Sequence, residues 1–129
     1  MILDTGFFEI YFSHFNEQVE NLMSEILQEK VEAYTTYLNI TEFYYINRKI
    51  ENEESTLIKI NSIFNSKIKV VPLNKKLAIR AGELKNTYKD LLSIVDTYVI
   101  ALAEMKRGEI ITVDSSIAKV YKNTTVIKK

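Results

Sequence analysis

The amino-acid sequence predicts an alternating α/β fold built around a parallel sheet. The chain opens with a short apolar run, Met1-Ile2-Leu3, which ends on a carboxylate at Asp4 and is followed by Thr5-Gly6. A run of this kind is typical of a buried parallel strand. Stretches rich in β-branched residues then alternate with stretches in which apolar residues recur every three or four positions. This alternation favours parallel strands joined by helices, with ligand sites at the carboxyl edge of the sheet.

Length and composition indicate one domain without disulfide bonds. A chain of 129 residues with 47% hydrophobic content can bury a continuous core, so a single domain is expected over 1–129. The absence of cysteine suits a cytoplasmic protein and restricts any metal ion to oxygen ligands or the lone His14. No signal peptide or membrane span is predicted, because Asp4 interrupts the first apolar run and no apolar stretch approaches about 18 residues.

The charges are divided unevenly along the chain, although the formal net charge is zero. Up to Ser66 there are four bases and eleven acids, a net charge of −7, and the remainder has thirteen bases and six acids, a net charge of +7. Such segregation suits an anionic partner such as nucleic acid. Solvated faces of mixed helices are the commoner cause, and the sequence leaves both interpretations open.

The first half of the chain is expected to contain a strand among several helices. The β-branched and aromatic residues at 31–38 predict the strand. Asn39-Ile40-Thr41 then offers cap residues, which places Glu42 in the first turn of the helix that follows. Further helices are expected at 7–15, at 17–29 and at 57–64. The side chains expected to face the core from the first two are Phe7, Phe8, Tyr11, Phe12, Phe15, Val19, Leu22, Met23, Ile26 and Leu27.

The second half repeats the alternation of strand and helix. A strand at 68–71 stops at Pro72, and Asn74 caps a helix that runs to about Lys89. A helix from Thr97 to Lys106 has an apolar middle, and Gly108 is expected to end it in a left-handed conformation. Three further elements are expected: a strand at 109–113, a short helix at 115–121 and a last strand at 124–127.

The helix after Asn74 is the best candidate for a surface that follows a phosphate backbone. Ordinary helix solubility explains its bases equally well. The basic residues on its outer face are Lys75, Lys76, Arg80, Lys85 and Lys89.

Four acids occupy comparable positions in this predicted fold. Asp4 and Asp114 end apolar strands, whereas Glu42 and Asp96 lie at or near the starts of helices. Each alone is explained by helix capping, and Ser93-x-x-Asp96 has the spacing of a capping box. Together at one sheet edge, however, like charges repel by roughly 1 kcal/mol in water and by more when partly buried. A cation such as Mg²⁺ or Mn²⁺ would relieve that repulsion and could assist phosphodiester hydrolysis.

These residues, in this order, resemble a PIN domain, and among PIN domains the small VapC-like toxin ribonucleases. The motifs that carry the resemblance are Ile2-Leu3-Asp4-Thr5, Ile40-Thr41-Glu42-Phe43, Asp96-Thr97-Tyr98-Val99-Ile100-Ala101-Leu102-Ala103 and Ile111-Thr112-Val113-Asp114. The resemblance covers essentially the whole chain. It implies a three-layer α/β/α sandwich with a central, mostly parallel sheet, and a pocket that binds Mg²⁺ or Mn²⁺ and cleaves RNA.

The resemblance also assigns roles to individual residues. Thr112 would support the acids through its hydroxyl, and Thr5 would help in the same way. Many family members have a further acid after the last motif, where this chain has Ser115 and Ser116. Independently of the resemblance, the basic face of the helix after Asn74 predicts RNA contacts at Lys75, Lys76 and Arg80. The acids that would hold the metal are Asp4, Glu42, Asp96 and Asp114.

The implied partners are an RNA substrate, an antitoxin protein whose segment enters the acidic groove, and a second copy of the chain in a homodimer.

One alternative function is that of a non-catalytic PIN-like module that binds RNA or protein. The absence of the further acid, where this chain has Ser115 and Ser116, favours it. A phosphoryl-accepting receiver domain is less favoured. That family has an acidic pair after its first strand and a lysine after a late strand, and neither aligns with this sequence.

Overall fold

A computed structural model describes all 129 residues. Its centre is a five-stranded sheet in the order β3-β2-β1-β4-β5, in which every neighbouring pair is parallel. Because all strands run the same way, their carboxyl ends meet at one edge of the sheet. The strands are β1 (Ile2–Leu3), β2 (Tyr34–Thr36), β3 (Lys69–Val71), β4 (Ile110–Thr112) and β5 (Thr124–Val126).

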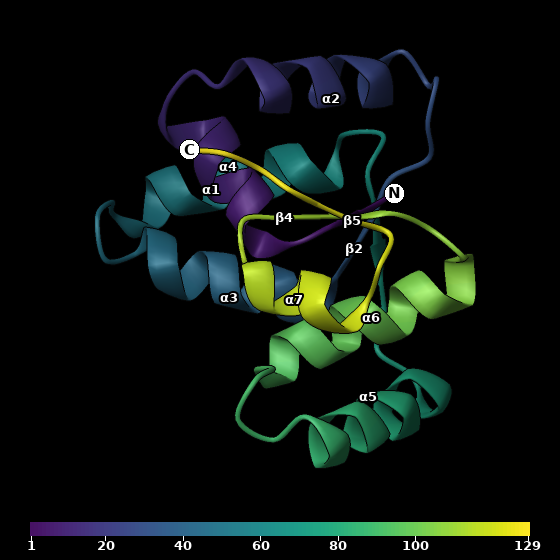
Figure 1. The fold of residues 1–129 in the computed structure, drawn as a ribbon. Helices are drawn as coiled ribbons and strands as arrows, with labels where there is room; N and C mark the ends of the chain where they lie inside the picture. Colours follow the sequence, from purple (N-terminus) through teal and green to yellow (C-terminus); the bar gives the residue numbers. More distant parts are fainter.

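Helices cover both faces of this sheet (Figure 1). Helices α1, α2 and α4 lie on one side, α6 lies on the other, and α5 packs against α6 as an outer layer. The predicted α/β sandwich with a parallel sheet is therefore confirmed. The helices are α1 (Thr5–Ser13), α2 (Glu17–Leu27), α3 (Tyr37–Asn47), α4 (Glu53–Phe64), α5 (Lys75–Thr87), α6 (Ile94–Lys106) and α7 (Ser115–Val120).

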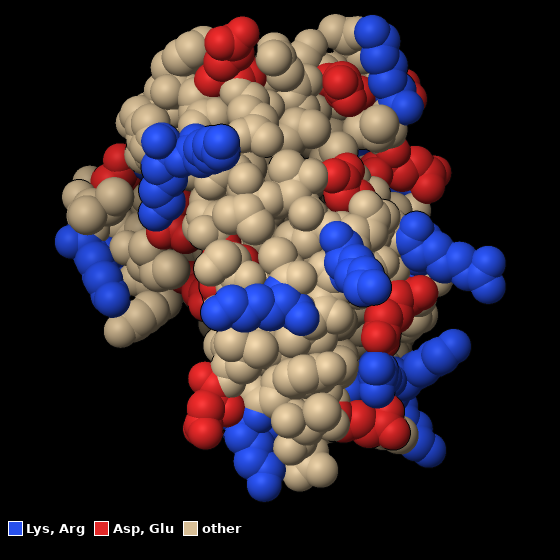
Figure 2. All heavy atoms as spheres, viewed as in Figure 1, with Lys and Arg blue, Asp and Glu red and all other residues tan.

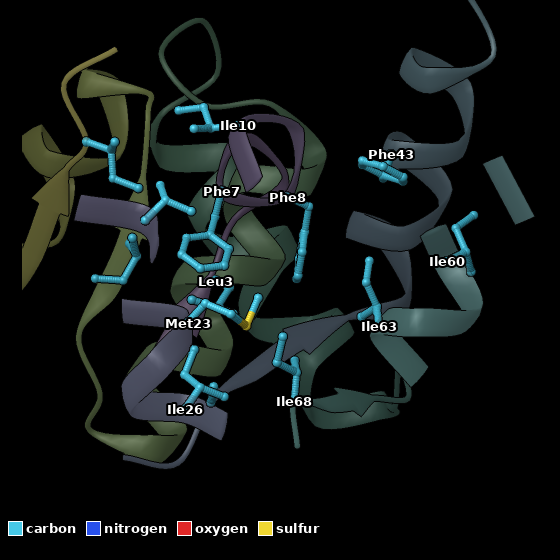
Figure 3. Close-up of a cluster of buried hydrophobic side chains, with 14 residues drawn as sticks. Leu3, Phe7, Phe8, Ile10, Met23, Ile26, Phe43, Ile60, Ile63 and Ile68 are labelled. Carbon is cyan, nitrogen blue, oxygen red and sulfur yellow. The ribbon is translucent and has the colours of Figure 1, made fainter. Parts of the chain in front are cut away.

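Two hydrophobic clusters form the core, one on each face of the sheet. Figure 3 shows the first, in which Phe7, Phe8 and Phe43 meet side chains of α2 and α4. The second is built around the apolar middle of α6. Successive strand residues point to opposite faces, so Leu3 belongs to the first cluster and Ile2 to the second. The two residues of β1 thus join both cores.

The start of α3 differs from the prediction. The strand expected at 31–38 is only Tyr34–Thr36, and α3 begins at Tyr37. Thr36 caps it in a reciprocal capping box: its hydroxyl accepts from the Asn39 N–H, and the Asn39 side chain accepts from the Thr36 N–H. The cap predicted at 39–41 is therefore wrong, and Glu42 lies in the second turn.

Four smaller predictions are also wrong. Gly108 is not the left-handed residue after α6; Arg107 is, with φ 52°, and the next N–H still bonds the Ala103 carbonyl. Helix α6 begins at Ile94, because the Ser93 capping box starts it three residues before Thr97. Phe15 is 75% exposed, since α1 ends at Ser13 and the helical spacing no longer points its ring inward. Leu27, the last residue of α2, is likewise 51% exposed rather than packed inside.

The face of the molecule in Figure 2 shows no division that matches the charge asymmetry of the sequence. On the face in Figure 2, Lys and Arg side chains are interspersed with Asp and Glu. The acidic and basic halves of the chain interleave in the fold, because β3 of the second half pairs with β2 of the first. None of the helices is both long and apolar enough to cross a bilayer.

Candidate functional site

The four predicted acids meet at the carboxyl edge of the sheet. Asp4 follows β1 and Asp114 lies just after the neighbouring β4; the Asp4 N–H extends this pairing by bonding the Ile111 carbonyl at 3.0 Å. Glu42 projects from α3, the helix that follows β2, and Asp96 lies in the first turn of α6. Two strands and two helices therefore each contribute one carboxylate.

The electrostatics of these acids show that they are neighbours without a counter-charge. Burial raises the pKa of Asp4, and the charges of Glu42 and Asp114 raise it further. Burial, and then the charges of Asp4 and Asp114, raise the pKa of Asp96 to about 6. Burial also raises the pKa of Glu42, with further contributions from Asp96, Glu9 and Asp114. None of the four acids forms an ion pair with a lysine, arginine or histidine.

Asp4 is the most constrained of the four. Its side chain is buried, and its Oδ1 atom accepts hydrogen bonds from the Thr5 N–H at 2.9 Å and from Asn39 Nδ2 at 3.1 Å. Its Oδ2 atom accepts a hydrogen bond from the Thr112 hydroxyl at 2.6 Å. Hydrogen bonds to the ionised form oppose the effect of burial. They hold the carboxylate in one orientation.

The two threonines predicted as supporting residues lie in contact with the acids. The Thr112 hydroxyl donates to Asp4 and accepts from the Asp114 N–H at 3.0 Å, so it connects two of the four acids. The Thr5 hydroxyl accepts from Asn39 Nδ2 at 3.0 Å, and a hydrogen bond from Thr5 lowers the pKa of Glu42 against the effect of burial. Their functional role stays a prediction.

Asn39 is a site residue that the sequence reasoning missed. It was expected only as a helix cap, yet its side chain is fully buried, and Nδ2 donates to both Asp4 and Thr5. Its Oδ1 atom accepts from the N–H and the hydroxyl of Thr36. The spacing Thr36-x-x-Asn39 indicated the capping box. Nothing in the sequence indicated the second pair of bonds, which joins residues more than thirty positions apart.

The sequence reasoning also missed Glu9 and Gly6. Both lie on α1, the helix that begins directly after Asp4. Glu9 is close enough to Glu42 to raise the pKa of that acid. It stands four residues after Thr5, which places it on the same helix face, and this spacing was the available signal. A Cβ atom on Gly6 would lie 2.3 Å from Cγ2 of Val113. Glycine therefore lets α1 approach the end of β4.

The donor chemistry of the cluster fits a hard divalent cation. Capping uses an oxygen of Asp96 for the Ser93 N–H and an oxygen of Asp114 for the Ser116 N–H. The second oxygen of each, and one oxygen of Glu42 beside the hydrogen bond from Thr5, remain without a hydrogen bond from the protein. Carboxylate oxygens are the ligands that Mg²⁺ and Mn²⁺ prefer. As the side chains stand, however, no three acidic or histidine residues are arranged to hold one ion together.

The predicted basic surface lies apart from this cluster. Arg80 forms two hydrogen bonds to the carboxylate of Glu104, at 2.7 and 3.0 Å, across the contact between α5 and α6. Glu104 follows Asp96 by eight residues on α6, or about 12 Å along the helix axis. Lys75 and Lys76 are exposed at the start of α5. The structure thus does not bring these three bases and the acids together.

Lys85 is also engaged within the protein. Its ammonium donates to the carbonyls of Lys89 and Leu92, where it fastens the loop between α5 and α6. His14, the lone histidine, is exposed and contacts the Ser13 hydroxyl at 2.8 Å.

Comparison with known proteins identifies the family. None of the curated proteins matches the chain. Among solved structures, a toxin-antitoxin complex from Klebsiella pneumoniae shares 17% identity over 97% of this chain and 95% of the other, with a TM-score of 0.70. FitAcB from Neisseria gonorrhoeae shares 15% identity over 98% and 96%, with a TM-score of 0.72. VapBC2 from Rickettsia felis, bound to a promoter DNA fragment, shares 17% over 98% and 96%, with a TM-score of 0.75.

At such identities these three structures show a common fold. The sequence pattern of the PIN domain family matches residues 1–123, a span that contains all four acids. The chain therefore belongs to the PIN domain family.

Proposed function

We propose that this protein is a metal-dependent endoribonuclease that hydrolyses RNA phosphodiester bonds, and that it is the toxin of a toxin-antitoxin pair. The observation that carries the proposal is the set of four neighbouring carboxylates without a base among them. Such a set costs folding free energy unless a cation binds it. A purely structural role does not explain why the fold keeps four unpaired charges together at this cost in folding free energy.

The acids that would hold Mg²⁺ or Mn²⁺ are Asp4, Glu42, Asp96 and Asp114. When bound, the ion supplies Lewis-acid stabilisation of the negative charge that develops on a phosphate during hydrolysis. The contribution of the chain is orientation. Thr112 and Asn39 fix the carboxylate of Asp4 from two sides, and the capping bonds of Ser93 and Ser116 fix Asp96 and Asp114.

The proposal of a toxin rests on the solved structures of similar fold. One of them is a toxin-antitoxin complex, and each of the three covers nearly the whole chain. An antitoxin protein is therefore the proposed partner, alongside the RNA substrate. The homodimer implied by the family resemblance stays a prediction, which the mass of the purified protein in solution will test.

RNA cleavage by acid-to-amide variants tests the enzymatic proposal. The parent is expected to cut single-stranded RNA with Mn²⁺ present and to stop when EDTA is added. Asp4→Asn should abolish cleavage and keep the fold, since it removes charge from a crowded site. The matched control is Glu104→Gln, whose acid lies outside the cluster. If Asp4→Asn cuts RNA as fast as the parent, the proposed site is wrong.

A non-catalytic binding module is the second candidate. Two observations favour it: no three acids stand ready to share an ion, and Ser115 and Ser116 replace the acid found in many relatives. Calorimetric titration with Mn²⁺ separates the two candidates. An absence of binding at millimolar Mn²⁺ would favour the binding module, whereas saturable binding that Asp4→Asn weakens would favour the enzyme.

A further inference from the structure

A cavity of about 420 Å³ lies beside the acidic cluster, bounded by α1, by α3 and the loop after it, and by Lys59 in the middle of α4. This volume lies in the range of small-molecule sites, which combine apolar walls with a few polar groups. The apolar side chains that line it are Ile10, Phe12, Phe43, Ile46, Ile50 and Val113.

The cavity borders the acids through their immediate neighbours in the chain. Phe43 follows Glu42, and Val113 precedes Asp114. Glu9 lines the cavity, and its charge also raises the pKa of Glu42, so one side chain lies next to both the cavity and the acidic cluster. A nucleotide whose phosphate lies at the acids would therefore have its neighbouring base within reach of this cavity.

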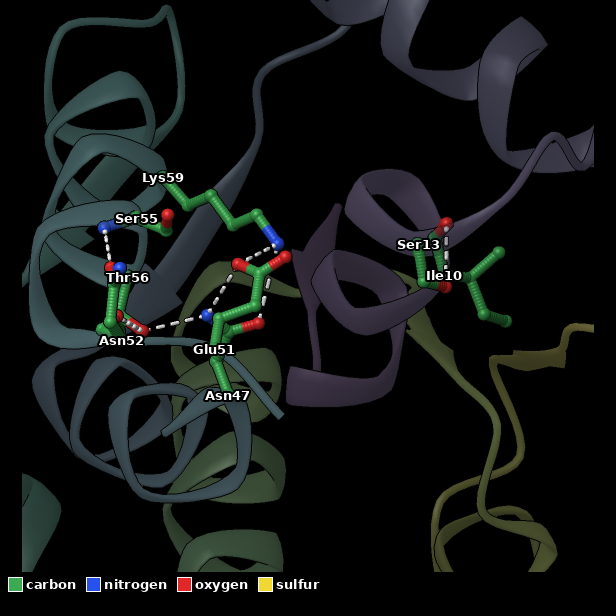
Figure 4. Close-up of polar contacts among 8 residues, drawn as sticks. All are labelled: Ile10, Ser13, Asn47, Glu51, Asn52, Ser55, Thr56 and Lys59. Atoms are coloured by element: carbon green, nitrogen blue, oxygen red, sulfur yellow. Dashed lines mark hydrogen bonds and ion pairs between the residues drawn. The ribbon is translucent and has the colours of Figure 1, made fainter. Parts of the chain in front are cut away.

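A polar group formed by Glu51, Lys59 and Asn47 also lines the cavity. The Glu51 Oε1 atom accepts from Lys59 Nζ at 2.6 Å and from Asn47 Nδ2 at 3.2 Å. Asn47 is buried and is itself held by the Thr56 hydroxyl at 2.8 Å. Figure 4 shows Lys59 and Glu51 extending toward α1, which carries Ile10 and Ser13.

This polar group still has hydrogen-bonding capacity. The ammonium of Lys59 has three protons and bonds only Glu51 and Asn47 within the protein, so one N–H stays free. The Glu51 Oε2 atom has no donor in the protein. The cavity thus presents one free donor next to one free acceptor, held in place by a buried amide.

The occupant that these features fit best is a flat, neutral group with a donor and an acceptor on one edge. Acids and bases in the lining offset one another, Glu9 and Glu51 against Lys59 and Lys129, so a phosphate gains little there. Unstacked bases of single-stranded RNA are held against aromatic side chains and hydrogen-bonded along their edges. Phe12, which is partly exposed, supplies the aromatic surface, and the buried ring of Phe43 packs behind it with a centroid distance of 5.7 Å.

We propose, on the basis of the ribonuclease function proposed above, that this cavity holds a nucleobase of the RNA next to the bond that is cut. Glu51 and Lys59 read the edge of that base and so set the sequence preference of cleavage.

The test uses the full chain in EDTA, titrated with each of the four nucleoside 5′-monophosphates while the Ile and Val methyl signals are followed by NMR. Saturable shifts are expected at Ile10, Ile46 and Val113, with the exposed Ile79 on α5 as an unaffected reference. Glu51→Gln should change the order of affinity among the four nucleotides. Ser13→Trp, at the exposed end of α1, should fill the cavity and weaken binding at least tenfold.

The outcomes separate this inference from the proposed function. If RNA is cut but no nucleotide shifts these methyl signals at millimolar concentration, the inference fails and the ribonuclease stands. If nucleotides bind in the cavity but no RNA is cut, the ribonuclease fails and the base pocket stands. Lys76→Gln, on α5, is the matched control for a change of surface charge. Binding that is unchanged in a folded Ser13→Trp would place the nucleotide elsewhere and overturn the inference.

Discussion

Helix α6 carries two acids whose surroundings are opposite. Glu104, near its end, is exposed and bonded twice by the guanidinium of Arg80. Asp96, near its start, is buried among other acids, and its pKa rises to about 6. One helix therefore holds a carboxylate with a cation and a carboxylate without one.

The difference is one of placement, because the chain has seventeen bases and seventeen acids. Surface pairs such as Arg80 with Glu104 form where both side chains can reach each other in water. At the sheet edge the neighbours are acids, Thr hydroxyls and an amide, and none supplies positive charge. The comparison indicates that the missing charge comes from outside the chain, which is the basis of the proposed metal site.

The largest expected effect is on RNA cleavage. Asp96→Asn should lower the cleavage rate in Mn²⁺ about a thousandfold, corresponding to roughly 4 kcal/mol of transition-state stabilisation. Glu104→Gln, on the same helix, should change the rate by less than about threefold. Rates measured on one labelled RNA under single-turnover conditions check both. Equal losses in the two variants would remove the distinction between the two ends of α6.

The next effect is the pH dependence of stability without metal. A carboxyl whose folded pKa lies above its unfolded value binds its proton more tightly in the folded protein, so stability falls as pH rises between the two values. For Asp96 these are about 6 and 3.8, a difference of about 3 kcal/mol at most. Urea denaturation in EDTA should show a loss from pH 4 to 6 that is smaller in Asp96→Asn. A parent that gains as much stability as the variant over this range would contradict the prediction.

Asn39→Ala should have an intermediate effect on stability. It removes a buried side chain and leaves the N–H and the hydroxyl proton of Thr36 without an acceptor, which costs about 2 kcal/mol. The same change frees the Asp4 carboxylate on one side, so cleavage should fall as well. Asn61→Ala, at an exposed position of α4, should cost less than about 0.5 kcal/mol. A stable but inactive Asn39→Ala would show that orientation matters more than satisfied hydrogen bonds.

The smallest effect is expected at the paired end of α6. Arg80→Gln should lower the free energy of unfolding by less than about 1 kcal/mol, because both partners are exposed. RNA affinity should change little, since Glu104 occupies the guanidinium. A fall in affinity much larger than the fall in stability would show that Arg80 contacts RNA, as the sequence suggested, and Lys76→Gln provides the comparison.

The sequence predicted the sheet and the position of the acids because both depend on local patterns. Asp4 and Asp114 end apolar strands, and parallel strands bring such ends together whatever the intervening helices do. The start of α3 was misplaced because β-branched residues favour a strand up to Leu38, while the capping box of Thr36 and Asn39, two reciprocal contacts between a side chain and an N–H, favours a helix. Asn39 was missed as a site residue because its bonds to Asp4 depend on how α3 packs against β1.

The pairing of β1 with β4 also affects when the protein becomes complete during synthesis. Asp4 bonds the Ile111 carbonyl and the Thr112 hydroxyl, and its strand has only two residues with which to hold that register. A growing chain that has not reached Asp114 lacks one of the acids and the contacts that orient Asp4. Strands β1 and β4 must therefore pair before the four carboxylates gather, and a chain that ends before β4 has three of the acids without the strand that orients the first of them.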